Sequence, residues 1–245
     1  MSALTAERLK LTSTRTTWWL AAALAGIVTL AAVVHFLSFD AAFVDEASEQ
    51  QSILTDIGVT MGLVFAAISG SLAITTEFRH GTIRPTLLKQ PDRTAIVSAK
   101  LVTQAVIGAT LAACAAAYAT GLAALLLDAR GLRFALDAGD VTRLVVGASV
   151  GGVLFAAGGL ALGTVVRNQV PVVVGLLIWV LFIENLLRAG APDVGRFAPG
   201  SLARAIAAPG AGALTSPVAA AATLAAVVVA LVLTARTTFT HRDII

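Results

Sequence analysis

Long uninterrupted apolar runs dominate the hydrophobic pattern of the chain. Six such runs occupy about residues 17–37, 54–76, 95–127, 142–166, 171–188 and 217–235. A helix of about 20 apolar residues crosses the hydrocarbon core of a bilayer, which is about 30 Å thick. Because apolar and polar positions do not alternate, the runs do not fit the strands of a β-barrel. The pattern predicts one all-α integral membrane domain, residues 1–245, with six transmembrane helices.

Composition supports this fold class. Charged residues make up only 13% of the chain, whereas a soluble domain has about a quarter. Cys114 is the single cysteine, so no disulfide can form within the chain, and we expect it to pack as a small apolar residue. The first apolar run lacks a convincing small-residue cleavage site, which predicts a retained span rather than a signal peptide.

Basic residues in the connections predict the orientation in the membrane. The connection between the first two runs holds four acidic residues and no Lys or Arg, whereas the next connection, 77–93, is basic. We therefore expect both termini in the cytoplasm. This topology places 6 basic residues outside and 11 inside, namely Arg8, Lys10, Arg15, Arg79, Arg84, Lys89, Arg93, Lys100, Arg167, Arg236 and Arg242.

Several segments are expected at the membrane surfaces. Trp18 and Trp19 predict an aromatic anchor at the cytoplasmic interface. The basic segment before them fits either an amphipathic helix on the inner leaflet or a partly ordered tail. The start of the third run, 95–100, is expected to project into the cytoplasm or interface. In the last connection, the helix-prone stretch 201–208 predicts a short helix or a re-entrant hairpin at the outer surface.

Glycines four positions apart let transmembrane helices approach closely. Such spacing arises often by chance in a chain rich in Ala and Gly, so packing within the bundle is favoured over a specific dimer face. The pairs are Gly58 and Gly62, Gly147 and Gly151, and Gly159 and Gly163.

The connection 77–93 is the most unusual polar stretch, with the sequence EFRHGTIRPTLLKQPDR. Ile83, Leu87 and Leu88 have the spacing of one helix face. Gly81 can adopt a backbone conformation closed to other residues, and Thr82 is a plausible helix N-cap. These features predict a short amphipathic helix that a soluble partner could grip. A solvated basic loop contacting lipid headgroups fits the same residues.

This stretch carries a family resemblance. The order Glu-Phe-Arg-x-Gly-Thr-Ile-Arg-x-Thr-Leu from Glu77, with Arg93 and Lys100 beyond it, resembles the first cytoplasmic loop of type-2 ABC permeases. The basic N-terminal segment is similar to that family's leading amphipathic segment. The six spans and the helix-prone outer connection also agree, so the resemblance covers essentially the whole chain. Pro85 and Asp92 fall where the family varies.

The resemblance implies a membrane subunit of an ATP-driven transporter, in most members an exporter. Two permease chains, here a homodimer by preference, would pair with two soluble ATPase subunits, which bind ATP and Mg. The first cytoplasmic loop would be the coupling helix, and the transport path would form at the dimer interface with helices two and five. The residues that match the coupling loop are Glu77, Arg79, Gly81, Thr82, Ile83, Arg84, Leu87 and Leu88.

The sequence lacks several common catalytic and nucleotide-binding motifs. The sequence has no G-x-x-x-x-G-K-S/T phosphate loop, no H-E-x-x-H zinc motif and no G-x-S-x-G elbow. His35, His80 and His241 are far apart in sequence, which argues against a local metal motif. We therefore expect no enzymatic activity and no cofactor or metal in this chain, with energy supplied by a partner or a gradient. Nothing in the chain indicates a nucleic-acid partner.

Ionisable residues within the spans are functional candidates. Asp56 lies near the outer end of the second span and Glu184 toward the outer end of the fifth. Arg188 follows Glu184 by four residues, a spacing that permits pairing on one helix face. Either both carboxylates reach the headgroup region, or they form a polar feature of an exit path.

The sequence therefore favours an exporter subunit in a bacterial cytoplasmic membrane, carrying an amphipathic or hydrophobic substrate such as a drug, lipid or peptide. Two alternatives remain open. One is a gradient-driven transporter, although a buried chain of acidic residues typical of proton-coupled pumps is not evident. The other is a structural or regulatory membrane protein without transport.

The predicted orientation can be tested by thiol labelling. A cysteine introduced at Ser48, in a chain without Cys114, is expected to react with a membrane-impermeant reagent added outside intact cells. Labelling only after the membrane is opened would reverse the topology.

Overall fold

The computed structural model describes residues 16–38, 47–83, 85, 88, 93–207 and 216–241, which are almost entirely helical. Within these residues six helices are long and apolar enough to cross a membrane, which confirms the predicted multi-pass all-α class. Five are continuous: α2 (Thr16–Ser38), α3 (Ala47–Arg79), α5 (Arg93–Asp128), α6 (Ala138–Val166) and α11 (Pro217–His241). The remaining span consists of α7 (Gln169–Ile178), a π-helical turn η2 (Trp179–Ile183) and α8 (Glu184–Gly190).

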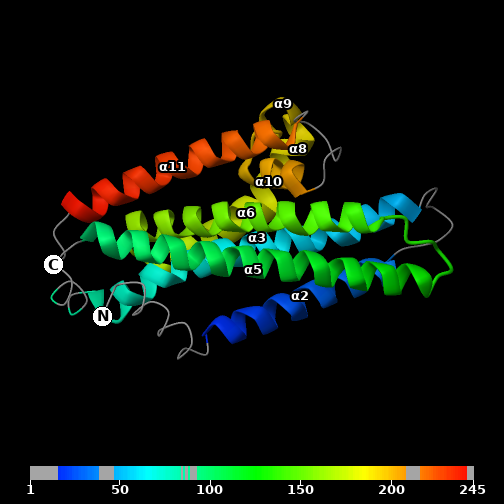
Figure 1. The fold of residues 1–245 in the computed structure, drawn as a ribbon, viewed down its shortest axis with the longest axis horizontal. Helices are drawn as coiled ribbons and strands as arrows, with labels where there is room; N and C mark the ends of the chain where they lie inside the picture. The colour runs from blue at the N-terminus through cyan, green and yellow to red at the C-terminus, as the bar shows by residue number, and fades with distance from the viewer. Residues whose placement is uncertain are drawn as a thin grey trace.

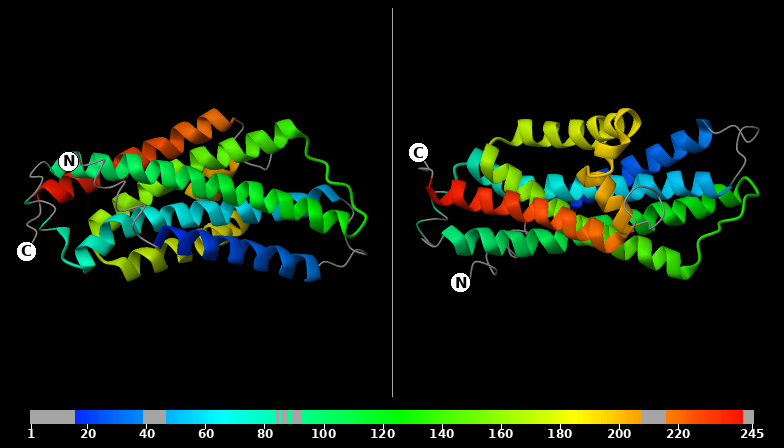
Figure 2. Two further views of the ribbon diagram at one scale, coloured as in Figure 1. Left: turned by 60° about the horizontal axis from the view of Figure 1, so that its bottom comes forward. Right: turned by 90° about the horizontal axis from the view of Figure 1, so that it is seen from above.

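The spans alternate in direction and lie roughly parallel (Figures 1 and 2). The end of α3 meets the start of α7, where Arg79 donates to Gln169, and the ends of α6 and α11 meet where Arg167 donates to the carbonyl of Thr238. The starts of α5 and α7 and the ends of α3, α6 and α11 therefore share one end of the bundle. We call it the turn end, because the turn at Gly81 lies there. Whether it faces the cytoplasm stays a prediction.

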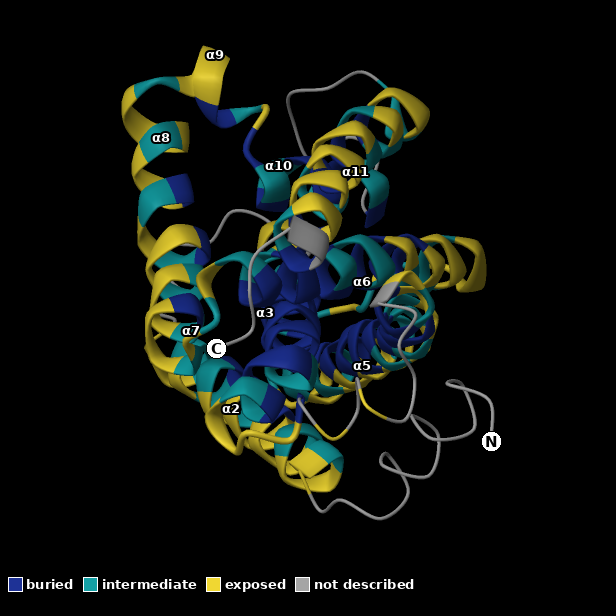
Figure 3. Ribbon diagram, turned by 90° about the vertical axis from the view of Figure 1, so that its left-hand side faces the viewer, coloured by how far each residue is buried: buried dark blue, intermediate teal, exposed yellow. Residues whose placement is uncertain are grey.

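Helices α3, α5 and α6 form the centre of the bundle. They pack on one another along most of their length, while α2 covers α3 and α5, α7 lies against α3 and α6, and α11 lies against α6. In Figure 3 α3 is largely buried, and α2, α8 and α11 show exposed outer faces. These outer faces are apolar, with exposed residues such as Leu30, Leu186 and Val229. Such faces suit contact with lipid.

Small residues set the spacing of the three central helices. A Cβ atom added at Gly159 of α6 would overlap the backbone carbonyl of Ala67 in α3. Added at Gly108 of α5, it would overlap the carbonyl of Gly152 in α6. The backbones thus touch directly, which is the geometry that small residues permit in membranes.

The predicted glycine pairs pack within the chain. Gly58 and Gly62 lie against Ala112, Ala115 and Ala119 of α5. The pair at 159 and 163 lies against α3, and the pair at 147 and 151 contacts the connection between the last two spans as well as α3. All three pairs therefore support packing within the bundle.

That last connection contains α9 (Pro192–Gly195) and α10 (Pro199–Ala207). The predicted helix at 201–208 is present as α10, although Ala208 lies outside the described residues. Ala207 packs on Gly147, nine residues into α6, so α10 lies about 14 Å along that helix rather than beyond its end. Figure 1 shows α10 beside the middle of the bundle. The short helix is therefore confirmed, whereas its re-entry into a bilayer stays a prediction.

Two expectations about single residues are wrong. Lys100 does not project from the bundle, because α5 packs against α3 there and leaves its side chain 1% exposed. Cys114 is exposed rather than packed, because it borders an open groove between α2 and α5. With Lys100 and the partly buried Arg204 removed from the connections, the basic asymmetry is ten against five, and the orientation argument is unchanged in sign.

The close approach of α3 and α6 yields a matched pair of variants. Gly159→Ala is expected to lower the midpoint of thermal unfolding, since overpacking of a core typically costs about 1–3 kcal/mol. Gly158→Ala, one residue away, meets only an ordinary contact with Val228. It should match the wild type or exceed it, because Ala is the better helix former. Equal midpoints for the two variants in detergent would contradict the direct backbone contact.

Candidate functional sites

The stretch that resembles a coupling loop begins with a tight helix stop. The N–H of Gly81 donates to the carbonyl of Phe78, and the N–H of Thr82 donates to that of Glu77. This pair of bonds is the Schellman arrangement, which requires a left-handed residue after the helix. Gly81 fills that position with φ of 66°, as its sequence position predicted. The chain therefore leaves α3 in a fixed direction.

A buried ion pair lies directly behind this turn. Lys100 Nζ of α5 is 2.8 Å from Glu77 Oε1 at the end of α3, and it also donates to the carbonyl of Ala73. Both side chains are almost completely buried. Burying two charges costs several kcal/mol each, and only a well-placed partner offsets that cost. A shift of α3 along α5 would separate the two side chains, so the pair favours this one register of the two helices. Glu77 thus contacts its own chain rather than facing a partner.

Ile83 continues the attachment of the turn to the bundle. It is 3% exposed and belongs to an apolar cluster drawn from the ends of four spans: Ile74 of α3, Val97 of α5, Leu160 of α6 and Phe239 of α11. Of the residues predicted to form the apolar face, Ile83 is therefore covered by this chain, whereas Leu88 is 87% exposed. Arg84 and Leu87 lie outside the described residues. Leu88 is the described residue that offers an apolar side chain to a partner.

The second site surrounds Glu184, at the start of α8. Its carboxylate is completely buried and accepts hydrogen bonds from Trp179 Nε1 at 3.0 Å and from the backbone N–H of Gly200 at 2.9 Å. Trp179 and Glu184 are five residues apart, and the π-helical turn Trp179–Ile183 between them brings both onto one side of the helix, so the indole reaches the carboxylate. A buried charge needs such partners. The alternative that Glu184 reaches the headgroups does not fit its burial.

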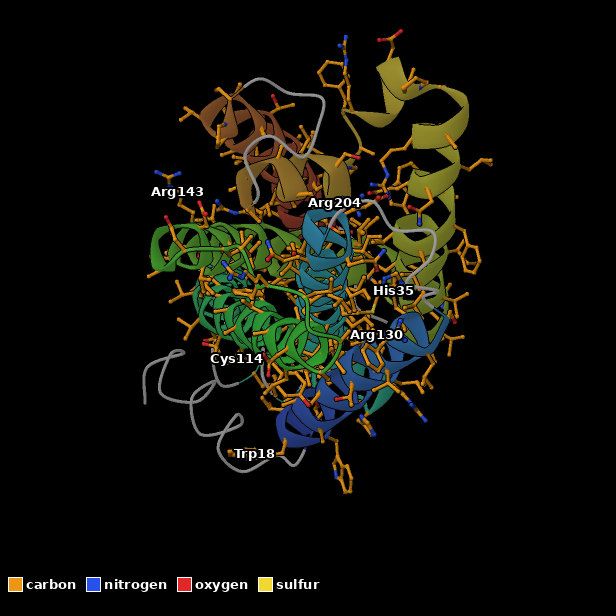
Figure 4. The ribbon with its side chains drawn as sticks, turned by 90° about the vertical axis from the view of Figure 1, so that its right-hand side faces the viewer. Trp18, His35, Cys114, Arg130, Arg143 and Arg204 are labelled. Carbon is orange, nitrogen blue, oxygen red and sulfur yellow. The ribbon has the colours of Figure 1, made fainter. Side chains whose placement is uncertain are left out.

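Arg204 of α10 connects the two predicted carboxylates. Its guanidinium lies 3.5 Å from Asp56 Oδ2 of α3 and 3.8 Å from Glu184 Oε2, and it donates to Thr60 at 3.3 Å. Figure 4 shows Arg204 between α10 and α3. Asp56 and Glu184, separated by 128 positions in the sequence, therefore belong to one polar cluster.

The spacing of Glu184 and Arg188 permits an ion pair, but the arginine within ion-pair distance of Glu184 is Arg204. The guanidinium of Arg188 instead donates a hydrogen bond to Asn185, one turn back on α8. One signal for Arg204 was present, because it is the single charge in the apolar helix-prone stretch 201–208. A lone charge in such a stretch needs a partner elsewhere in the fold.

Trp18 and Trp19, the predicted interface anchors, lie in the first turn of α2 and are 76% and 71% exposed. Figure 4 shows Trp18 pointing away from the bundle, as an aromatic anchor requires. The basic segment before them lies outside the described residues.

Within the described ranges, no group of three or more His, Cys, Asp or Glu side chains could hold a metal ion. No known protein-family model matches the chain, and no curated protein matches it significantly.

The polar cluster predicts a specific pattern of stability. Arg204→Gln leaves Glu184 without its ion-pair partner; breaking a fully buried pair costs about 3–5 kcal/mol, an upper bound here since Arg204 is 12% exposed. The double variant Glu184→Gln/Arg204→Gln should recover part of the loss, because the buried charge is then gone. Thermal midpoints of the single and double variants check this, with Arg143→Gln on the exposed surface as control. A double variant less stable than Arg204→Gln would contradict the coupling.

Proposed function

We propose that this chain is the membrane-spanning permease subunit of an ATP-driven transporter, an exporter by family resemblance, and that a separate ATPase hydrolyses the ATP. The observation that carries the proposal is the attachment of the turn. The resembling stretch leaves α3 at a fixed angle, and its residue Ile83 packs against the ends of four spans. A force applied to this stretch would reach the whole bundle.

The proposed mechanism follows that attachment. Closure of two ATPase subunits would move the segment around Leu88, and the Glu77–Lys100 pair would pass the movement to α3 and α5. Because α3, α5 and α6 touch through their backbones, they would move as one body. The less buried α2, α7 and α11 would then shift relative to it or to a second copy of the chain. ATP would thereby bias an equilibrium between inward- and outward-open states.

An apolar cavity supports an apolar or amphipathic cargo. It has a volume of about 520 Å³ and lies between α6, α7 and α11, with Phe155, Val172, Trp179 and Leu231 among its lining residues. Cavities of this size hold small organic molecules. The basic asymmetry supports placement of the turn end in the bacterial cytoplasm, where ATP is available.

The exposed side chain of Leu88 provides the test of the coupling role. Leu88→Asp is expected to reduce co-purification of an ATPase subunit and ATP hydrolysis by about 30-fold or more, since truncating an apolar anchor can cost 2 kcal/mol or more. The thermal midpoint of the chain alone should stay within error of the wild type. Co-purification of the ATPase, ATP hydrolysis and the thermal midpoint are all measured after purification from the source membrane.

Ser98→Asp is the matched control. It introduces the same charge at an exposed position near the start of α5, which lies at the same end of the bundle. It should leave assembly and hydrolysis unchanged. If Leu88→Asp behaves like Ser98→Asp, the stretch is a lipid-contacting loop. If the wild-type chain purifies without any ATPase, a gradient-driven transporter or a structural membrane protein takes the place of the proposal.

A further inference from the structure

A second cavity, also of about 520 Å³, lies beside the polar cluster. It is a half-open cavity lined by residues of α3, α6, α8, α9 and α10, and it differs from the apolar cavity in its charged lining. The charged and hydroxyl groups on its walls include Asp56, Arg188, Arg196, Ser201 and Arg204.

The lining carries a positive excess. Three arginines face one aspartate, so the formal charge of these walls is +2. Glu184 is not part of the lining, but it pairs with Arg204 from behind and reduces the formal charge at the cavity to +1. Asp193 lies 3.9 Å from Arg196, but its carboxylate is 94% exposed and therefore screened by solvent. The cavity thus favours an anion.

Three residues that line the cavity also carry buried donor atoms without acceptors. Among the described residues, Ser201 Oγ, Arg196 Nε and Arg204 Nη2 are buried and have no hydrogen-bond partner. The 3.8 Å separation of Arg204 Nη2 from Glu184 is too long for a hydrogen bond. Buried donors in native proteins nearly always have an acceptor, so these three atoms call for one. Arg204 Nη2 faces the buried acceptor Glu184 Oε2, which also lacks a hydrogen-bond partner, so the need for a further acceptor rests on Ser201 and Arg196.

We propose that this cavity is a binding site for an anionic phosphate group. Arginine forks match phosphate oxygens in geometry and charge, and the cavity offers three of them on different elements. The group is either the headgroup of an anionic phospholipid or free phosphate. The exposed apolar side chain of Phe197, which lies next to Arg196, would contact the acyl chains of a lipid. The site stands independently of transport.

Native mass spectrometry of the full chain in non-ionic detergent tests this site. Phosphatidylglycerol should bind more tightly than phosphatidylcholine of the same chain length. Arg188→Gln should weaken phosphatidylglycerol binding about tenfold, the effect of losing one charge-assisted hydrogen bond. Arg143→Gln, on the exposed surface of α6 and pointing away from the bundle in Figure 4, should change nothing.

Asp56→Asn gives the opposite sign. It removes the one lining carboxylate, so phosphatidylglycerol should bind more tightly, an outcome that a misfolded variant would not produce. Inorganic phosphate identifies the source: displacement of the lipid by millimolar phosphate, weakened by Arg188→Gln, assigns the site to the free anion, and no displacement assigns it to the lipid. Equal effects of Arg188→Gln and Arg143→Gln, or weaker binding in Asp56→Asn, would overturn the site.

Discussion

Direct backbone contact among α3, α5 and α6 is the constraint on which the rest of the structure depends. Small residues at their crossings leave no room for even one added methyl group, as at Gly108 and Gly159. In lipid, where helices gain nothing from excluding water, such contact is a main source of association. The three helices form a dense centre, and the other spans attach to it with apolar outer faces.

Two polar attachments fix this centre at different depths. At the turn end, the Glu77–Lys100 pair joins α3 to α5. Farther along, Arg204 joins the inserted helix α10 to α3 and to α8. Each charge is costly to bury, so each is held by a specific partner. One attachment lies behind the stretch that would receive a force, and the other lies beside the cavity that would hold a phosphate group.

The sequence predicted the spans well because length and continuous apolarity are strong local signals. It also predicted the left-handed Gly81, since the turn chemistry lies within a few residues. It failed where the answer is tertiary. Burial of Lys100 depends on a partner 23 positions away. The ion pair of Glu184 with Arg204 depends on how deeply α10 enters the bundle. The ATPase partner and the cargo stay predictions of resemblance.

We propose that this chain works as a permease within an ATP-driven assembly. The most direct test is the mass of the intact assembly extracted gently from its source membrane. We expect two copies of the 24.9 kDa chain together with two ATPase subunits. A chain that emerges as a monomer or dimer with no ATPase, under conditions that preserve other membrane complexes of that source, would contradict it.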